Sequence, residues 1–182
     1  MDIAPTPIEN LVIVTPKRHG DARGFFAETW NTAALAQRGF DWTFVQDNQS
    51  LSEAKGTLRG LHYQAPPHAQ AKLVRCGRGA VWDVAVDVRP GSETYAQWFG
   101  IELSAENGRQ LYIPEGFLHG FSTLTDGAEL LYKCSAPYNA EADGAVRYDS
   151  PTLAIDWKLD GAPVLSDKDR AAPVFADWTN PF

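Results

Sequence analysis

Cysteine and histidine are both scarce in this sequence. It contains two cysteines, Cys76 and Cys134, and four histidines among 182 residues. A framework of disulfide bonds needs more cysteines than this. The fold therefore has to be stabilised by a hydrophobic core, which a chain of this length is large enough to bury. We expect both cysteines to be reduced thiols.

Basic charge is also scarce. The chain has 16 Lys and Arg against 23 Asp and Glu, which gives a formal net charge of -7, and its pI is near 5.0. Binding to nucleic acids or to membrane surfaces needs a basic face, so this balance argues against both. A small anionic ligand remains compatible with it, because a few inward-facing cations are enough to bind one.

Long apolar runs are absent. No hydrophobic stretch approaches the roughly 18 residues of a membrane-spanning helix. The first residues, Met-Asp-Ile-Ala-Pro-Thr-Pro, lack the charged and apolar regions of a secretory signal. We therefore expect a cytoplasmic protein with no membrane association.

Short apolar or alternating runs, separated by turn residues, fill most of the chain. The chain has 15 glycines and 12 prolines, and sequences such as Arg-Pro-Gly-Ser and Thr-Asp-Gly are typical of tight turns. The runs predict strands at 11–14, 25–30, 57–63, 71–76, 80–88, 94–103, 110–113, 119–124, 129–134 and 153–157. This pattern favours an all-β sandwich or barrel, in a single domain that spans residues 1–182.

Two short segments have the features of helices. Residues 31–38 begin at Asn31, a good capping residue, are rich in helix formers and end before Gly39. At 166–170, Ser166 precedes two aspartates, which favours a capped first turn. The proline-rich ends of the chain are expected to be surface tails.

The most informative segment is Leu-Arg-Gly-Leu-His-Tyr-Gln at 58–64. In a regular strand, Arg59 and Leu61 share one face and His62 lies on the other. Arginine is rarely buried without an anionic partner, which favours a functional role for the histidine beside it over a structural one. We expect His62 to face the interior of a barrel. A second candidate, His119, lies where a strand end can point it into a barrel mouth.

The spacing around these two histidines is similar to that of the metal-binding cupins, but the ligand set is incomplete. Such a site needs a second histidine two residues after the first and a downstream glutamate. Here Gln64 replaces the second histidine and Lys72 stands where the glutamate would be. A cation beside the remaining two ligands would repel a metal ion. The sequence therefore predicts a barrel without a metal centre.

Seven separated segments resemble one family. They are 21–28 (Asp-Ala-Arg-Gly-Phe-Phe-Ala-Glu), 46–48 (Gln-Asp-Asn), 58–64, 70–75 (Gln-Ala-Lys-Leu-Val-Arg), 79–87 (Gly-Ala-Val-Trp-Asp-Val-Ala-Val-Asp), 114–121 (Pro-Glu-Gly-Phe-Leu-His-Gly-Phe) and 165–169 (Leu-Ser-Asp-Lys-Asp). In this order they resemble the dTDP-4-dehydrorhamnose 3,5-epimerases of the cupin superfamily. The resemblance implies a cupin-type jelly roll and a homodimer without metal or organic cofactor. It also implies an isomerase that inverts C3 and C5 of dTDP-4-dehydro-6-deoxy-D-glucose.

The resemblance also implies roles for individual residues. His62 would be the catalytic base, Asp169 its partner, Lys72 the cation that stabilises the enolate oxygen, and Tyr132 the acid. The substrate-binding positions would be Arg23, Glu28, Gln46, Asn48, Arg59, Asp83, His119, Tyr138, Asp143 and Lys168. A thymine ring needs an aromatic or apolar shelf, for which Phe26 and Tyr138 are candidates. Asp143 departs from the family, which more often has glutamate there.

Three other interpretations remain open from the sequence. A single-centre epimerase acting on a related dTDP-4-keto sugar would share these motifs. A non-catalytic cupin that binds sugar nucleotides would keep the arginines, but would not need Asp169 together with His62. A metal-dependent cupin isomerase or dioxygenase would contain stoichiometric metal.

Overall fold

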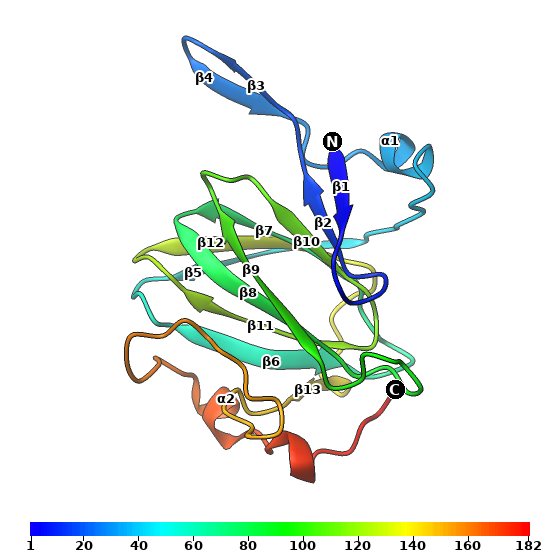
Figure 1. Ribbon diagram of the computed structural model, residues 1–182, viewed down its shortest axis with the longest axis vertical. Coiled ribbons are helices and arrows are strands. Elements are labelled where there is room, and N and C mark those ends of the chain that lie inside the picture. The colour runs from blue at the N-terminus through cyan, green and yellow to red at the C-terminus, as the bar shows by residue number, and fades with distance from the viewer.

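Two antiparallel sheets form the body of the protein in a computed structural model that describes all residues 1–182 (Figure 1). One sheet has six strands, in the order β1 (Asp2–Pro5), β2 (Val12–Thr15), β10 (Gln110–Ile113), β7 (Lys72–Arg78), β12 (Ala128–Cys134) and β5 (Gln46–Ser52). The other has five, in the order β13 (Asp143–Ala145), β6 (Leu58–Gln64), β11 (Phe117–Thr123), β8 (Ala80–Asp87) and β9 (Trp98–Ser104). A separate hairpin of β3 (Arg18–Asp21) and β4 (Gly24–Ala27) projects from the body (Figure 1). The architecture is the expected cupin-type jelly roll.

The main hydrophobic core lies between the two sheets. The six-stranded sheet contributes Val74, Leu111 and Leu130, and the five-stranded sheet contributes Ala85 and Phe121. Side chains alternate between the two faces of a strand. Residues two positions away from these core residues therefore face the same interior, and this places the functional side chains described below.

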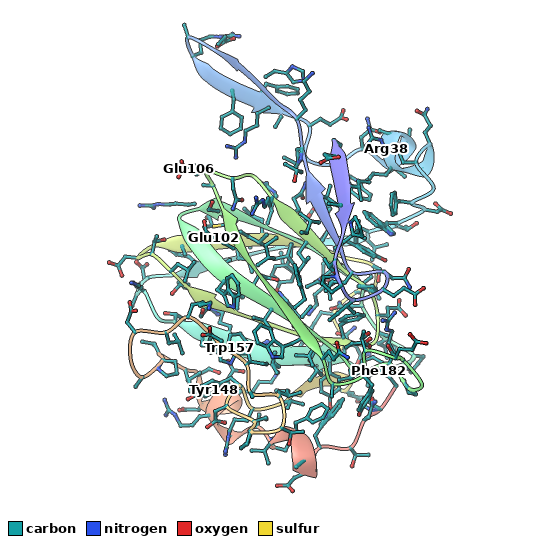
Figure 2. The ribbon with its side chains drawn as sticks, in the orientation of Figure 1. Arg38, Glu102, Glu106, Tyr148, Trp157 and Phe182 are labelled. Atoms are coloured by element: carbon teal, nitrogen blue, oxygen red, sulfur yellow. The ribbon has the colours of Figure 1, made fainter.

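A second core lies on the opposite face of the five-stranded sheet, beneath the C-terminal segment. Trp157 is buried there, and its indole N–H donates to the backbone oxygen of Tyr148 at 2.9 Å (Figure 2). Trp178 and Phe182 pack against the same cluster, and Trp178 donates to the hydroxyl of Tyr63 at 3.0 Å. The C-terminal end is therefore packed against the sheet, and β1 at the other end is paired with β2. The expectation of surface tails was wrong.

Both predicted helices are confirmed, the first in shortened form and the second shifted by one residue. Helix α1 (Thr32–Ala36) begins after Asn31, whose side chain accepts from the N–H of Ala34. Helix α2 (Asp167–Ala171) begins after Ser166, whose hydroxyl accepts from the N–H of Asp169 at 3.1 Å. A single turn, η1 (Phe175–Asp177), follows near the C-terminus. None of these helices is long and apolar enough to cross a membrane.

Most predicted strands are confirmed to within a few residues, with three corrections. Residues 153–157 form turns and irregular structure. The apolar residues Leu153 and Trp157 of this segment are buried in the second core, but the segment pairs with no strand. The predicted strand at 94–103 begins only at Trp98, since residues before it form a turn held by Asp87. The segment at 25–30 is strand only as far as Ala27 and belongs to the exposed hairpin.

A β-bulge in β6 changes which residues face the interior. His119 pairs with His62, and Phe121 pairs with Arg59, so three steps along β6 match two steps along β11. The bulge requires glycine at position 60, where φ is +114° and an added Cβ would lie 2.7 Å from the backbone of β11. The expected alternation was wrong here. Leu61 faces the second core, whereas Arg59 and His62 share the inner face.

Candidate active site

The imidazole of His62 and the carboxylate of Asp169 form a hydrogen-bonded pair at one side of the interior. Helix α2 brings Asp169 to β6, where its Oδ1 lies 2.5 Å from Nε2 of His62. The carboxylate accepts at this contact, so Nε2 carries the proton and Nδ1 keeps a free lone pair. The His62 side chain is 33% exposed and that of Asp169 only 3%. The pair therefore presents an accessible base backed by a buried anion.

The surroundings of Asp169 keep it ionised. Burial by itself raises the pKa of this carboxyl, but the hydrogen bond and charge of His62 outweigh it, with help from Ser166 and the N–H of Gly60. The net result is a pKa below the usual aspartate value. The pair borders a cavity of about 310 Å³, which is also lined by Arg59 and Lys168.

A second histidine–aspartate pair faces the first across neighbouring strands. His119 lies directly opposite His62 in the pairing of β11 with β6. Its Nε2 contacts both carboxylate oxygens of Asp83, at 3.1 and 2.9 Å. The side chain of His119 is 9% exposed and that of Asp83 is fully buried. This pair is more enclosed than the first and fixes the orientation of its imidazole.

Lys72 projects into the interior from the six-stranded sheet. It lies two residues before the core residue Val74 on β7 and pairs with Cys134 on β12. Burial lowers the pKa of its ammonium group, and the charges of Cys134, Asp83 and Asp143 oppose this effect through space. The Lys72 side chain is half-buried.

The phenol of Tyr132 faces the same interior from β12. Tyr132 packs against the main core and lies opposite Asn48 on β5. Burial raises the pKa of the phenol, and Cys134 and Asp143 add to this, whereas the charge of Arg59 and a hydrogen bond from Asn48 act against it. A phenol from one sheet and an imidazole from the other are therefore both close to Arg59.

A polar cluster lies at the mouth of this interior. Asp143 on β13 accepts from the Tyr138 hydroxyl at 3.1 Å and forms an ion pair of 2.5 Å with Lys168 on α2. The shorter side chain of Asp143, compared with glutamate, thus still reaches both partners. Tyr138 is 60% exposed, so its ring presents a free face to solvent.

Three predicted site residues lie away from this interior. Arg23 and Phe26 are on the projecting hairpin, and Glu28 follows it. The Arg23 side chain is 90% exposed and its only ion pair is with Asp21, while Phe26 is 71% exposed. Within one chain, the fold does not bring these residues to His62.

Two residues at the site were not assigned a role from the sequence. Cys134 is fully buried between Lys72 and Asn48, and Asn48 Nδ2 lies 3.5 Å from its sulfur. Its position two residues after Tyr132 on one strand is the signal that could have placed it on the same face. Gln64 holds the loop that carries Tyr138, because its Oε1 accepts from the N–H of Asn139 at 2.9 Å.

The side chains of the site do not form a metal-binding group. The protein contains no cluster of three or more His, Cys, Asp and Glu side chains placed to hold a metal ion. Nε2 of each site histidine is already engaged by an aspartate. The cations Lys72 and Arg59 instead suit an anionic ligand or a developing negative charge.

Comparisons with known proteins agree on one family. The family model described as dTDP-4-dehydrorhamnose 3,5-epimerase matches residues 5–177. The enzyme of that name from Salmonella typhimurium is 49% identical over 175 residues, which cover 96% of this chain and 95% of that protein. A dTDP-6-deoxy-D-glucose-3,5-epimerase from Legionella pneumophila, solved in complex with dTDP-4-keto-L-rhamnose, is 47% identical. It superposes with a TM-score of 0.92 over 97% of this chain and 93% of the other.

A relative with a narrower described activity has the same fold. The 3'-monoepimerase from Streptomyces bikiniensis, solved in complex with dTDP-quinovose, is 39% identical. It superposes with a TM-score of 0.88 over 94% of this chain and 87% of its own. Similarity of fold alone therefore does not separate single-centre from two-centre epimerases.

Proposed function

This chain belongs to the dTDP-4-dehydrorhamnose 3,5-epimerase family, and from that premise we propose that it inverts C3 and C5 of dTDP-4-dehydro-6-deoxy-D-glucose. The product is dTDP-4-dehydro-L-rhamnose, on the route to dTDP-L-rhamnose. The protein is an isomerase. One observation carries the proposal for its site: an imidazole from one sheet and a phenol from the other border the same interior, with a half-buried lysine beside them.

His62 is proposed as the base. C3 and C5 both flank the C4 ketone, so the same carbonyl acidifies both C–H bonds. Nδ1 of His62 is free to accept a proton because Nε2 is engaged by Asp169. Asp169 orients the ring and stabilises the imidazolium as it forms, the role that a carboxylate has in hydrolase triads. An imidazole is suited to proton transfer near neutral pH.

Lys72 is proposed to stabilise the enolate. Removal of either proton moves negative charge to the C4 oxygen, and a fixed cation at such an oxygen accelerates reactions by on the order of 10²–10³. Lys72 fits this role because its half-buried side chain lies on the inner face of β7 and forms no ion pair within the chain. Its ammonium group is therefore available to a ligand oxygen.

Tyr132 is proposed as the acid. Inversion requires that a proton arrive on the face opposite the one from which it left, so His62 alone is not sufficient. Tyr132 approaches from the opposing sheet. Its raised pKa keeps the phenol protonated at neutral pH, and the charge of Arg59 favours the phenolate left after transfer. The two groups can thus act on opposite faces of one sugar ring.

The nucleotide is proposed to bind at the mouth. Arg59 offers a planar cation to the diphosphate, and the exposed ring of Tyr138 offers a shelf for thymine. Gln46, Asn48, Asp83, His119, Asp143 and Lys168 line the remaining path as proposed substrate contacts. Arg23, Phe26 and Glu28 lie outside this path in the single chain.

We further propose a homodimer, in which the hairpin of one subunit completes the site of the other. The hairpin exposes Phe25 and Phe26 to 59% and 71%, a large apolar area for a segment that packs against little of its own chain. Its Arg23 would supply a second cation for the diphosphate. The free thiols of Cys76 and Cys134 are compatible with a reducing compartment, and we propose a cytoplasmic location.

The test is incubation of the purified protein with dTDP-4-dehydro-6-deoxy-D-glucose in deuterium oxide, with NMR to locate the deuterium. We expect deuterium at both C3 and C5 and a product of the L-rhamno configuration. Deuterium at one carbon only would identify a single-centre epimerase, and no incorporation would leave a binding protein. Elemental analysis of the active protein should find metal far below one equivalent. Stoichiometric iron, manganese or zinc would support the metal-dependent alternative.

A further inference from the structure

Three glutamine side chains hold the loop of residues 135–139, which follows β12 and carries Tyr138. Together they bind one backbone group in each of four successive residues. The hydrogen bonds run from Nε2 of Gln70 to the oxygen of Ala136 at 2.7 Å, from Nε2 of Gln64 to the oxygen of Pro137 at 3.0 Å, and from the N–H groups of Tyr138 and Asn139 to Oε1 of Gln46 and of Gln64, both at 2.9 Å. We call these three glutamines the glutamine frame.

Gln64 is the central member of the glutamine frame. It is buried, and its NH₂ group donates to two carbonyl oxygens, that of His68 at 2.5 Å and that of Pro137 at 3.0 Å. A carbonyl oxygen can only accept and a backbone N–H can only donate, so these contacts fix the orientation of the amide. Both N–H groups of the side chain are thereby used within the chain. Gln64 has no donor left for a ligand, and its effect on one must pass through the loop.

Tyr138 is fixed at two points. The glutamine frame holds its backbone, and its hydroxyl donates to Asp143 at 3.1 Å. Asp143 is itself held by the ion pair with Lys168. Between these two points Tyr138 is 60% exposed. An exposed ring that is already held in place loses little further freedom when a planar group stacks on it, and such preorganisation strengthens binding.

We propose that Gln64 and Gln70 are positioning residues for Tyr138, and that they increase affinity for the nucleobase of the substrate rather than for its diphosphate. The diphosphate is assigned to Arg59, whose guanidinium is held by hydrogen bonds to β5 and not by this loop. Nucleobase and diphosphate binding therefore depend on different hydrogen bonds and should respond differently to mutation. The inference rests on the proposed function, because that function places a nucleobase on Tyr138.

The test measures the Kd of two ligands, dTDP and inorganic pyrophosphate, by calorimetry. Gln64→Met keeps a side chain of similar length but removes all three hydrogen bonds to the loops, so Tyr138 is no longer held at its backbone. We expect the ratio of the Kd for dTDP to the Kd for pyrophosphate to rise about tenfold, which is within the range for loss of one stacked base. An equal loss of affinity for both ligands would overturn the inference, since a general folding defect affects both.

Gln70→Met provides a second variant, and Gln49→Met is the matched control. Gln70 makes one hydrogen bond to the loop, so its loss should raise the Kd ratio by a smaller factor, about threefold. Gln49 is exposed on β5 and its amide contacts Glu129 instead of the loop. We expect the control to keep the wild-type ratio. An unchanged ratio in whichever of Gln64→Met and Gln70→Met folds would overturn the inference.

A positioning residue for Tyr138 should have no effect once Tyr138 is removed. In a Tyr138→Ala background, Gln64→Met should therefore raise the Kd for dTDP by less than about twofold. If the losses from the two substitutions were fully additive, Gln64 would act independently of Tyr138 and the inference would be wrong. A wild-type protein that bound dTDP no more tightly than pyrophosphate would also contradict it.

A measurement without ligand separates positioning from direct contact. Amide hydrogen exchange, followed by NMR, reports how firmly the N–H groups of Tyr138 and Asn139 are held. We expect both to exchange about tenfold faster in Gln64→Met than in the wild type or in Gln49→Met. Unchanged exchange would overturn the inference. If the wild type bound dTDP but washed no deuterium into the keto sugar, the proposed function would fail, and the Kd ratio would still decide this inference.

Discussion

His62 and His119 lie directly opposite each other on β6 and β11, and each directs Nε2 to an aspartate that is almost or completely buried. The two pairs differ in access, because the His62 side chain is 33% exposed and that of His119 only 9%. A base must reach the sugar carbons, whereas a binding group needs only to present one N–H or lone pair. The exposed pair is therefore the better candidate for proton abstraction, and the enclosed pair for positioning the substrate.

The first prediction follows from this difference. His62→Ala should abolish deuterium wash-in at both C3 and C5, because no other accessible base borders the cavity. Asp169→Asn should lower wash-in at least a hundredfold while the fold is retained, since an amide no longer stabilises the imidazolium. His119→Ala serves as the comparison and should weaken substrate binding but keep wash-in. Normal exchange by His62→Ala would show that the base is another group.

The second prediction concerns the opposite face of the sugar. Tyr132→Phe keeps the ring and its packing against the core but removes the proton donor. We expect wash-in to continue at one carbon or both, because His62 can return solvent deuterium to the face from which it took the proton. Net inversion should fall by about 10²–10⁴, the usual range for a general acid. NMR of the product in deuterium oxide measures both quantities, and equal loss of both would argue against an acid role for Tyr132.

The core strands were predictable from the sequence, because apolar alternation marks strands with one face in the core. Strand β5 was not, although it carries Gln46 and Asn48. One face of this strand lines the polar interior and the other, with Asp47 and Gln49, faces solvent. No apolar period therefore exists to mark it. At 153–157, by contrast, a strand was predicted where none forms, because the apolar residues there are buried without a strand partner.

The site was predictable mainly through its motifs, which supplied a list of residues but not their arrangement. The bulge at Gly60 could not be foreseen, because it depends on the close approach of β11. Without it, Arg59 would face away from His62. The remote position of Arg23 and Phe26 was equally hidden, since nothing in the local sequence says that the hairpin leaves the body of its own chain.

The third prediction concerns Lys72, whose charge is expected to cost stability. Burial lowers its pKa, so the unfolded chain binds a proton more readily than the folded protein. This contribution makes stability rise as pH increases through the lowered pKa toward the ordinary value near 10.5. Lys72→Met should therefore raise the free energy of unfolding at neutral pH by about 1 kcal/mol and reduce epimerisation by about 10²–10³. Urea denaturation and an activity assay check the pair of outcomes, and a destabilised variant would contradict the first.

The fourth prediction concerns Asp87, a fully buried carboxylate that holds the turn before β9. Burial raises its pKa, but hydrogen bonds from Arg89, Ser92 and Thr94 outweigh this and lower it to about 2. Since the unfolded value is near 3.9, the difference corresponds to about 2.5 kcal/mol of stability. It is present above pH 4 and is lost as pH falls toward 2.

Asp87→Asn should accordingly lower the free energy of unfolding by about 2 kcal/mol at pH 7, as measured in urea. The difference in the free energy of unfolding between variant and wild type should become smaller when the same measurement is made below pH 4. Asp47→Asn is the control, because Asp47 forms an exposed ion pair with Lys133 and should change stability by less than about 1 kcal/mol. If this difference in the free energy of unfolding did not change with pH, the turn would not depend on an ionised Asp87.

The fifth prediction tests whether the hairpin completes a partner's site. Arg23→Ala and His62→Ala should each be inactive, the first for lack of a diphosphate contact and the second for lack of a base. When the two are unfolded together and refolded as a mixture, half of the dimers should be mixed. In each mixed dimer, the site that combines an intact His62 with an intact Arg23 from the other chain should be active. The mixture should then recover about a quarter of the wild-type activity. If Arg23 instead served its own chain, both sites of every mixed dimer would lack one group, and mixing would restore nothing.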